Sequence, residues 1–275
     1  MARLNRTGYG RGAVLLLTGM YFLVPIACAI SFSVGIGGPR QSVGLDAYTG
    51  IFGADGFASS LTLTLKLATA TIVLVLGLLV PALVTVRLAA PRLRALVEIA
   101  CTLPLVVPAV ALVAGISTVL RWGPDHFAGT PLFHVMVALQ APEFPLVLVL
   151  AYTLMALPLA YRTLDTGLSA VDLRVLVEAA RSCGASWPRT LAHVVLPNLR
   201  GALLNTAFLT LALVLGEYTV AAVLGYQPFA VWIVAISGSQ AQMSVAVSMV
   251  GLLGTWILLL AISATGRTRR PKETS

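Results

Sequence analysis

Six apolar segments, each long enough to cross a lipid bilayer, constrain this chain more than any other feature of its sequence. They cover residues 13–35, 60–86, 96–120, 144–164, 201–225 and 244–265. A helix needs about 20 mostly apolar residues to cross roughly 30 Å of hydrocarbon. Of the 275 residues, 58% are hydrophobic and only 10% are charged, which excludes a soluble globular fold. The sequence therefore predicts an all-α integral membrane protein with six transmembrane helices.

The distribution of cationic residues predicts the orientation of these helices. Lys and Arg near helix ends stay on the cytoplasmic side of a membrane. With a cytoplasmic N-terminus, 15 of the 18 Lys and Arg residues fall on that side. The membrane domain then spans residues 13–265, and residues 1–12, the loop 165–200 and the tail 266–275 are cytoplasmic. Topology also explains the net charge of +8, and no basic stripe with interleaved aromatic residues indicates nucleic acid binding.

The first apolar segment also has the features of a cleaved secretory signal, with a small-residue site at Ala27-Cys28-Ala29. Its length favours a membrane-spanning helix instead. Cys28, Cys101 and Cys183 lie in different segments and form no CxxC pair, so the sequence predicts neither a disulfide framework nor a metal site.

The cytoplasmic loop 165–200 contains the string GLSAVDLRVLVEAARSCGASWPRTLAHVVLPNLRG, which predicts a helix, a tight turn and a second helix. Ser169 and Asp172 are three residues apart, as in a capping box at a helix start. Gly184 falls where the first helix should end, because glycine readily adopts the left-handed conformation of a sharp turn. Ser186 is a candidate cap for the second helix, and Pro197 breaks the chain before the fifth span.

Within this loop, the pattern Glu178-Ala179-Ala180-x3-Gly184-x9-Val194-x-Leu196-Pro197 resembles the EAA signature of ABC importer permeases, EAA-x3-G-x9-I-x-LP. Val194 is a conservative replacement for Ile. The resemblance implies a methionine-permease-like fold in which this loop carries a coupling helix that docks on a separate ATPase subunit. In that role, Ala179 and Ala180 leave a low surface, Glu178 offers a carboxylate to a cationic partner, and Gly184 and Pro197 fix the angle of the loop. The alternative is an amphipathic hairpin that only lies on the bilayer.

The chain contains no GxxxxGK[ST] string, so it lacks the loop that cradles nucleotide phosphates. We therefore expect the chain not to be an enzyme and to bind no cofactor, with ATP and Mg²⁺ in the partner ATPase subunit. The resemblance further implies a second permease subunit, identical or homologous, and an extracytoplasmic solute-binding protein. It places the chain in the plasma membrane of a prokaryote.

The solute is the least constrained part of the prediction. Segments Leu103–Pro108 and Gly216–Ala221 resemble permeases for iron, thiamine and polyamines, which favours a polyamine or a similar small cation. Ferric iron, thiamine, phosphonate and oxyanions remain open. A secondary transporter driven by an ion gradient is a more distant alternative, and the chain shows no in-membrane relay of acids or histidines that would support it.

Two ionisable residues, Lys66 and Glu217, lie inside predicted spans, where a charge is costly and usually faces the bundle interior or a watery cavity. Both are expected at a similar depth in the outer part of the membrane. We expect them to line the translocation pathway and to pair there. The alternative for Lys66 is that its long side chain extends to the membrane interface.

Overall fold

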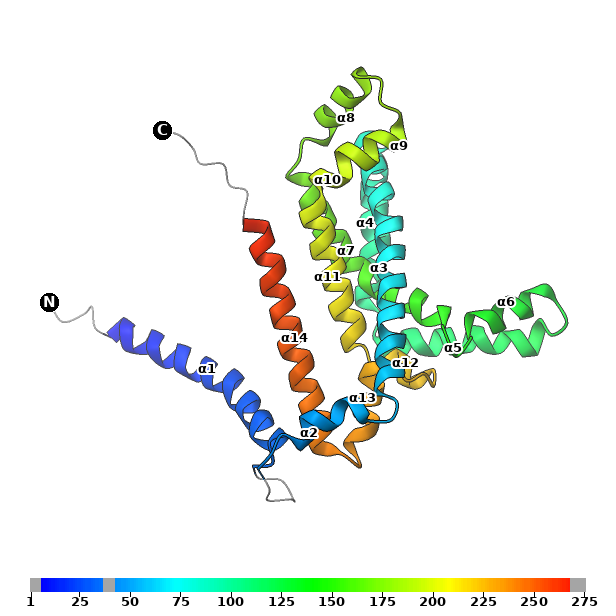
Figure 1. Ribbon diagram of the computed structural model, residues 1–275. Coiled ribbons are helices and arrows are strands. Elements are labelled where there is room, and N and C mark those ends of the chain that lie inside the picture. The colour runs from blue at the N-terminus through cyan, green and yellow to red at the C-terminus, as the bar shows by residue number, and fades with distance from the viewer. Residues whose placement is uncertain (1–5, 37–42, 268–275) are drawn as a thin grey trace. The chain divides into compact units, whose positions relative to one another are not determined.

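The computed structural model describes residues 6–36 and 43–267, and in these ranges it contains helices and turns but no strand. Residues 1–5 of the predicted cytoplasmic N-terminus and residues 268–275 of the predicted tail lie outside the described residues, and residues 6–12 belong to α1. The chain divides into two compact units. The N-terminal unit comprises the residues up to Ala58 together with Trp232–Trp256, and the central unit comprises Ser59–Val231 with the end of the last helix. Figure 1 labels the helices of both units.

The central unit is built around three long helices, α3 (Phe57–Leu88), α7 (Leu146–Ser169) and α11 (Arg200–Gly216). Two clusters of buried apolar side chains hold them together. One cluster gathers Leu83, Val84, Leu164, Leu168 and Val195, among others. The second gathers Leu67, Leu148, Tyr152, Val214 and Val220. Because lipid is as apolar as these side chains, close packing and polar contacts must supply the stability of the unit.

The third predicted span, residues 96–120, is not one straight helix. The chain forms η2 (Pro91–Leu93), α4 (Arg94–Thr102), η3 (Leu103–Val106) and then α5 (Ala109–His126). The segments before and after the break meet at 99°. Pro104 and Pro108 lie at the break, where each removes a backbone donor that a continuous helix would use. Figure 1 shows α5 returning through α6 (Pro131–Leu139) as a hairpin that extends away from the three long helices.

The fourth predicted span is confirmed as a continuous helix. Pro142 and Pro145 precede α7, and Pro158 is accommodated within it. The fifth predicted span, residues 201–225, is interrupted: α11 ends at Gly216, Glu217 is extended, and the short α12 (Thr219–Val223) follows.

Three helical segments, Gly12–Ser33, Phe57–Leu88 and Leu146–Ser169, are each long and apolar enough to cross a membrane in the described part of the chain. The number rises to five if each of two strongly bent helix pairs is counted as one span, and Ala241–Ile257 is a shorter apolar helix. The prediction of six spans is therefore compatible with the helices but not settled by their lengths.

The N-terminal unit contains α1 (Arg6–Ser33), α2 (Asp46–Thr49), η1 (Gly50–Gly53), most of α13 (Phe229–Ser237) and the first part of α14 (Ala241–Arg267). The Ser33 and Tyr48 hydroxyls are 2.7 Å apart, and Trp232 Nε1 donates to the Asp55 carbonyl at 2.9 Å. These polar contacts join helices that share little apolar core. Most side chains of α1 from Val14 to Val24 are exposed in the isolated chain.

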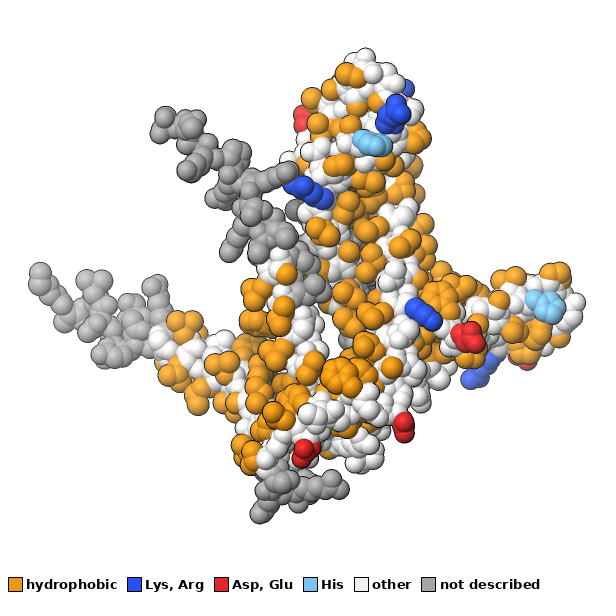
Figure 2. Space-filling view, viewed as in Figure 1, with side chains coloured by type: hydrophobic (Ala, Val, Ile, Leu, Met, Phe, Trp, Pro, Cys, Tyr) orange, Lys and Arg blue, Asp and Glu red, His pale blue; other side chains and the backbone are white. Residues whose placement is uncertain are grey.

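Hydrophobic side chains cover much of the visible face of α3 and α11, whereas Lys, Arg and His gather at the end that carries α8 and α9 (Figure 2). Among these apolar residues, Leu65, Val73, Leu78 and Leu204 are exposed on the central unit. An apolar surface of this kind matches a lipid environment, and the charged end matches an aqueous one.

Candidate functional site

The motif loop, residues 165–200, folds into α8 (Leu173–Ser182), α9 (Trp187–Thr190), a π-helical turn at Leu191–Val195 and α10 (Leu196–Asn198). This agrees with the predicted order of helix, turn and helix. The loop lies at one end of α7 and α11 and at the C-terminal end of α3, as Figure 1 shows.

The start of α8 differs in one detail from the prediction. Asp172 is the N-cap, and its carboxylate accepts a hydrogen bond from the Val175 backbone N–H at 3.3 Å. Ser169 takes no part in a capping box, because it is the last residue of α7 and its hydroxyl donates to the Asp165 carbonyl at 2.7 Å. The prediction for Ser169 was therefore wrong, since α7 continues beyond the expected end of the fourth span.

Gly184 forms the predicted turn at the end of α8. Its φ is +80°, in the left-handed region. The Gly184 N–H donates to the Arg181 carbonyl at 2.9 Å, and the Ala185 N–H donates to the Ala180 carbonyl at 3.1 Å. This pair of bonds is a Schellman motif, which satisfies carbonyls that the helix end would leave open. The Schellman motif fixes the direction in which the chain leaves α8.

One face of α8 is buried and the opposite face is open. Leu173 and Val177 join the apolar cluster formed by α3 and α7. Glu178 and Ala179 are exposed, and Ala180 is half-buried. The motif residues Glu178 and Ala179 thus lie on a surface that no described residue covers, where another protein can approach.

The second half of the motif lies on the return path. Val194 belongs to the π-helical turn, and Leu196 and Pro197 belong to α10. Pro197 has no N–H to donate to the carbonyl four residues earlier, and its ring crowds that carbonyl, which accounts for a locally widened helix. The chain then bends by 76° into α11. Pro197 therefore stands at the elbow between the motif loop and α11, as predicted.

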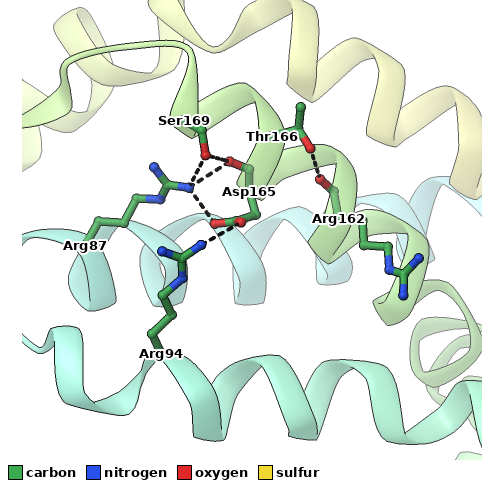
Figure 3. Close-up of polar contacts among 6 residues, drawn as sticks. All are labelled: Arg87, Arg94, Arg162, Asp165, Thr166 and Ser169. Atoms are coloured by element: carbon green, nitrogen blue, oxygen red, sulfur yellow. Dashed lines mark hydrogen bonds and ion pairs between the residues drawn. The ribbon is translucent and has the colours of Figure 1, made fainter.

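A cluster of charged groups that the sequence did not single out lies at the start of the motif loop, where α7 ends (Figure 3). Asp165, one turn before the end of α7, accepts a 2.5 Å contact at Oδ1 from Arg87 Nη2 and a 3.3 Å contact at Oδ2 from Arg94 Nη2. The same Arg87 nitrogen donates to the Asp165 carbonyl and to the Ser169 hydroxyl, each at 2.7 Å. Arg87 lies on α3, Arg94 opens α4, and Asp165 and Ser169 lie on α7. One carboxylate thus connects three helices.

The charged residues of this cluster are visible in the sequence, but the arginines were interpreted as evidence for membrane orientation. Arg87 and Arg94 were counted as evidence for membrane orientation, and Asp165 marked only the beginning of the loop. An acidic residue at the end of one span, together with arginines at the ends of neighbouring spans, indicates a possible ion pair. The sequence alone does not show which helix ends meet.

The two predicted pathway residues lie in different surroundings. Glu217 is buried, with 8% of its surface exposed, and both of its carboxylate oxygens accept from the Val220 backbone N–H, at 3.0 and 3.2 Å. Lys66 is exposed on α3. Among the described residues the ion pairs are those of Asp165, so the structure does not bring Lys66 and Glu217 together. Glu217 instead caps the first turn of α12, just after the break in the fifth span.

Within residues 6–36 and 43–267, no three His, Cys, Asp or Glu side chains are grouped so as to hold a metal ion. The arrangement that stands out is an exposed surface on α8 next to a set of ion-paired helix ends.

Comparison with known proteins identifies the class of this fold. Over most of its length the chain resembles a solved bacterial alginate ABC transporter in complex with an alginate pentasaccharide-bound periplasmic protein, with a TM-score of 0.66, 15% identity, and coverage of 94% of this chain and 93% of the other. A second structure, of a bacterial ABC transporter involved in import of the acidic polysaccharide alginate, gives a TM-score of 0.63 at 15% identity, covering 95% and 96%. The fold is that of an ABC transporter permease.

A family model for the binding-protein-dependent transport system inner membrane component matches residues 74–267. A probable sulfate transport system permease protein of Nephroselmis olivacea is 31% identical over 207 residues, covering 75% of this chain and 70% of the relative. The chain belongs to the binding-protein-dependent transport system inner membrane component family, and it is an ABC importer inner-membrane permease.

Proposed function

We propose that this chain forms the translocation pathway of an ATP-driven importer and that its motif loop docks on a separate ATPase subunit. The observation that supports docking is the division of α8 into two faces. Leu173 and Val177 anchor α8 to the membrane helices, while Glu178 and Ala179 remain open at the end of the central unit. A hairpin lying on a bilayer would present apolar residues on its open face. Here the open face carries the charged side chains of Arg174, Glu178 and Arg181 beside the small Ala179, with Val175 as the large apolar side chain among them.

The partners follow from this role. The solved relatives are ABC transporters, one of them in complex with a periplasmic binding protein. This supports an extracytoplasmic solute-binding protein and other ABC transporter subunits as partners of this chain, and we propose that these subunits are ATPases that bind ATP and Mg²⁺ and a second permease. The exposed apolar side chains of α1 are also consistent with contact to lipid or to the second permease subunit.

The docking role is tested with Ala179→Trp. Because Ala179 is exposed, the larger side chain should leave the fold intact but hold a partner away from α8. We expect at least about tenfold weaker co-purification of the ATPase subunit, equivalent to a loss of roughly 1.4 kcal/mol. Ala138→Trp is the matched control, because Ala138 is exposed on α6, outside the motif loop. Unchanged co-purification of the Ala179→Trp variant would sink the docking proposal.

For the solute, we propose an oxyanion such as sulfate as the first candidate. The identity with a probable sulfate permease supports this choice. The sequence-based preference for a polyamine rested on the resemblance of two segments to other permeases, and Glu217 as an acidic group of the pathway was only compatible with a cation. That carboxylate is buried and accepts from the Val220 N–H, so in this structure it binds the backbone of α12.

Uptake into proteoliposomes that contain the complete complex distinguishes these possibilities. Radiolabelled sulfate and radiolabelled spermidine are supplied in parallel, each with the cognate binding protein and with internal ATP. We expect ATP-dependent accumulation of sulfate and none of spermidine. Accumulation of spermidine alone would reverse the assignment, and uptake that needs an ion gradient but no ATP would favour a secondary transporter.

A further inference from the structure

We propose that Asp165 is a joint that transmits movement of the motif loop to α3 and α4. This inference rests on the proposed docking function and deepens it, because it names the residues through which a force on α8 reaches the membrane helices. The joint consists of Asp165 and Ser169 on α7, Arg87 on α3 and Arg94 on α4 (Figure 3).

The position of Asp165 in the chain makes it suited to this role. It lies four residues before the end of α7, and only three residues separate that end from α8. A displacement of α8 therefore acts first on the last turn of α7. Both carboxylate oxygens are occupied there, and each binds an arginine from a different helix. Movement of this turn must carry the two arginines with it or break one of the two contacts.

The two arginine contacts are unequal. The side chains of Arg87 and Asp165 are 21% and 20% exposed, and Arg87 Nη2 makes three contacts on α7. Arg94 is 58% exposed and makes one longer contact of 3.3 Å. Charge-assisted bonds in partly buried surroundings are stronger than exposed ion pairs. The contact between Arg87 and Asp165 is thus the stronger one, and the contact between Arg94 and Asp165 is the one that can break.

The surroundings of the joint leave room for such a change. A cavity of about 440 Å³ lies beside it, lined by Arg87, Leu88 and the consecutive residues Ser169–Arg174. Arg87 Nε is buried and has no hydrogen-bond partner among the described residues. A buried donor without a partner raises the free energy of this arrangement. The short connection from α7 to α8 borders this cavity.

Arg162 provides a contrast within the same helix end. Its side chain is exposed and points away from Asp165 in Figure 3, and its carbonyl accepts from the Thr166 hydroxyl at 2.8 Å. A cationic side chain near the end of α7 therefore does not contact Asp165 merely because it is close in the sequence. The joint depends on the register that places Arg87 and Arg94 opposite Asp165.

The test measures movement of α4, which begins at Arg94 and ends at Thr102. Cys101 lies near the end of α4, with 6% of its surface exposed, so a shift of α4 changes its access to reagents. With Cys28 and Cys183 replaced by serine, Cys101 is the sole thiol of the chain. The complex with the ATPase subunit is placed in lipid nanodiscs, and the rate of Cys101 alkylation by a maleimide is measured without nucleotide and with ATP plus vanadate.

We expect nucleotide to change the alkylation rate of the otherwise native chain by about fivefold or more, the lower end of typical coupling between sites. Asp165→Asn should abolish that change while co-purification of the ATPase subunit stays normal. Arg94→Gln should also reduce the nucleotide-dependent change in the alkylation rate. The double variant should reduce this change no further than Asp165→Asn alone. Arg94 is exposed, so its variant keeps the test valid if Asp165→Asn fails to fold. Glu143→Gln and Arg162→Gln are the controls for loss of an exposed charge.

The outcomes separate the joint from the docking proposal. If Asp165→Asn and Arg94→Gln both retain the nucleotide response, the joint is overturned and docking is left intact. The same conclusion follows if the unaltered chain binds its ATPase subunit but shows no nucleotide response. Failure of the unaltered chain to bind an ATPase subunit would overturn both. A merely structural ion pair would lower the melting temperature of the variants without removing the nucleotide response.

Discussion

Gly184 is the motif residue whose chemical requirement is most direct. Its φ of +80° costs an L side chain about 1–2 kcal/mol, and a Cβ built there meets no atom within 4 Å. The penalty of Gly184→Ala is therefore one of backbone conformation alone. Because the Schellman motif sets the direction of the loop after α8, we expect the ATPase subunit to bind this variant roughly 5- to 30-fold more weakly.

The measurement is the affinity of the ATPase subunit for the purified permease in detergent. Gly201→Ala is the matched control, since Gly201 also has open space around its Cβ position but lies in α11 without a positive φ. Equal affinities for the two variants would show that the left-handed turn is not needed for docking.

Glu217 shows how an ionisable residue in a span can serve the backbone instead of the solute. Its oxygens bind the Val220 N–H, the first turn of α12 after a break in the chain. Glu217→Ala removes this cap and should destabilise the protein by about 1 kcal/mol. Glu217→Gln keeps a carbonyl oxygen for the same bond and should stay close to the original stability.

Thermal unfolding of the detergent-solubilised protein checks the order of these two variants, and uptake adds a second readout. If the carboxylate charge serves the solute, Glu217→Gln will lose transport at unchanged melting temperature. If the cap is its role, Glu217→Gln will transport at an unchanged melting temperature and Glu217→Ala will melt at a lower temperature.

At the scale of the helices, the packing of α7 on α11 depends on one very small residue. A Cβ added at Gly167 would lie 2.3 Å from the Cβ of Ala202. Small residues allow membrane helices to approach closely, and overpacking such a contact costs about 1–3 kcal/mol. Gly167→Ala should therefore lower the melting temperature, and Gly167→Ala with Ala202→Gly should recover most of the loss.

The swapped pair is the control for this prediction, because it restores the total side-chain volume at the crossing. A double variant as unstable as Gly167→Ala would mean that the glycine is required for some other reason than this contact.

The effect of a proline on its helix could not be predicted from the sequence, because it differs from one proline to another. Pro158 lies within the continuous α7, while Pro104 and Pro108 accompany a 99° change of direction. Every proline removes one backbone donor, but whether the helix breaks depends on what neighbouring helices supply in return. The apolar lengths were therefore predictable, and the breaks in the third and fifth spans were not.

The same distinction applies to the site. The turn at Gly184 was predicted, because turn geometry is a local property of the chain, whereas the open surface at Glu178 and Ala179 was expected from the family resemblance. The contacts of Asp165 with Arg87 and Arg94 were not predicted, since they join residues more than 70 positions apart. A long-range ion pair leaves no periodic pattern in the sequence.

At the scale of the whole molecule, the docking role of the motif loop depends on the orientation of the chain in the membrane. Labelling of Cys183 tests this orientation. This residue caps α8 at the turn of the motif loop and is exposed. The cationic residues predict that the loop lies in the cytoplasm. In a Cys28→Ser variant, a membrane-impermeant maleimide should not label Cys183 in intact spheroplasts but should label it in inside-out vesicles. Addition of the ATPase subunit should then protect it.

The matched control moves the thiol to the opposite side. Ser239 is exposed in the turn between α13 and α14, which the predicted topology places outside the cell. With Cys28 and Cys183 replaced by serine, Ser239→Cys should be labelled in spheroplasts. Labelling of Cys183 in spheroplasts, or of the Ser239→Cys variant only in inside-out vesicles, would invert the orientation. The Glu178 and Ala179 surface would then face away from the compartment that holds ATP, and the docking role of the motif loop would fall with it.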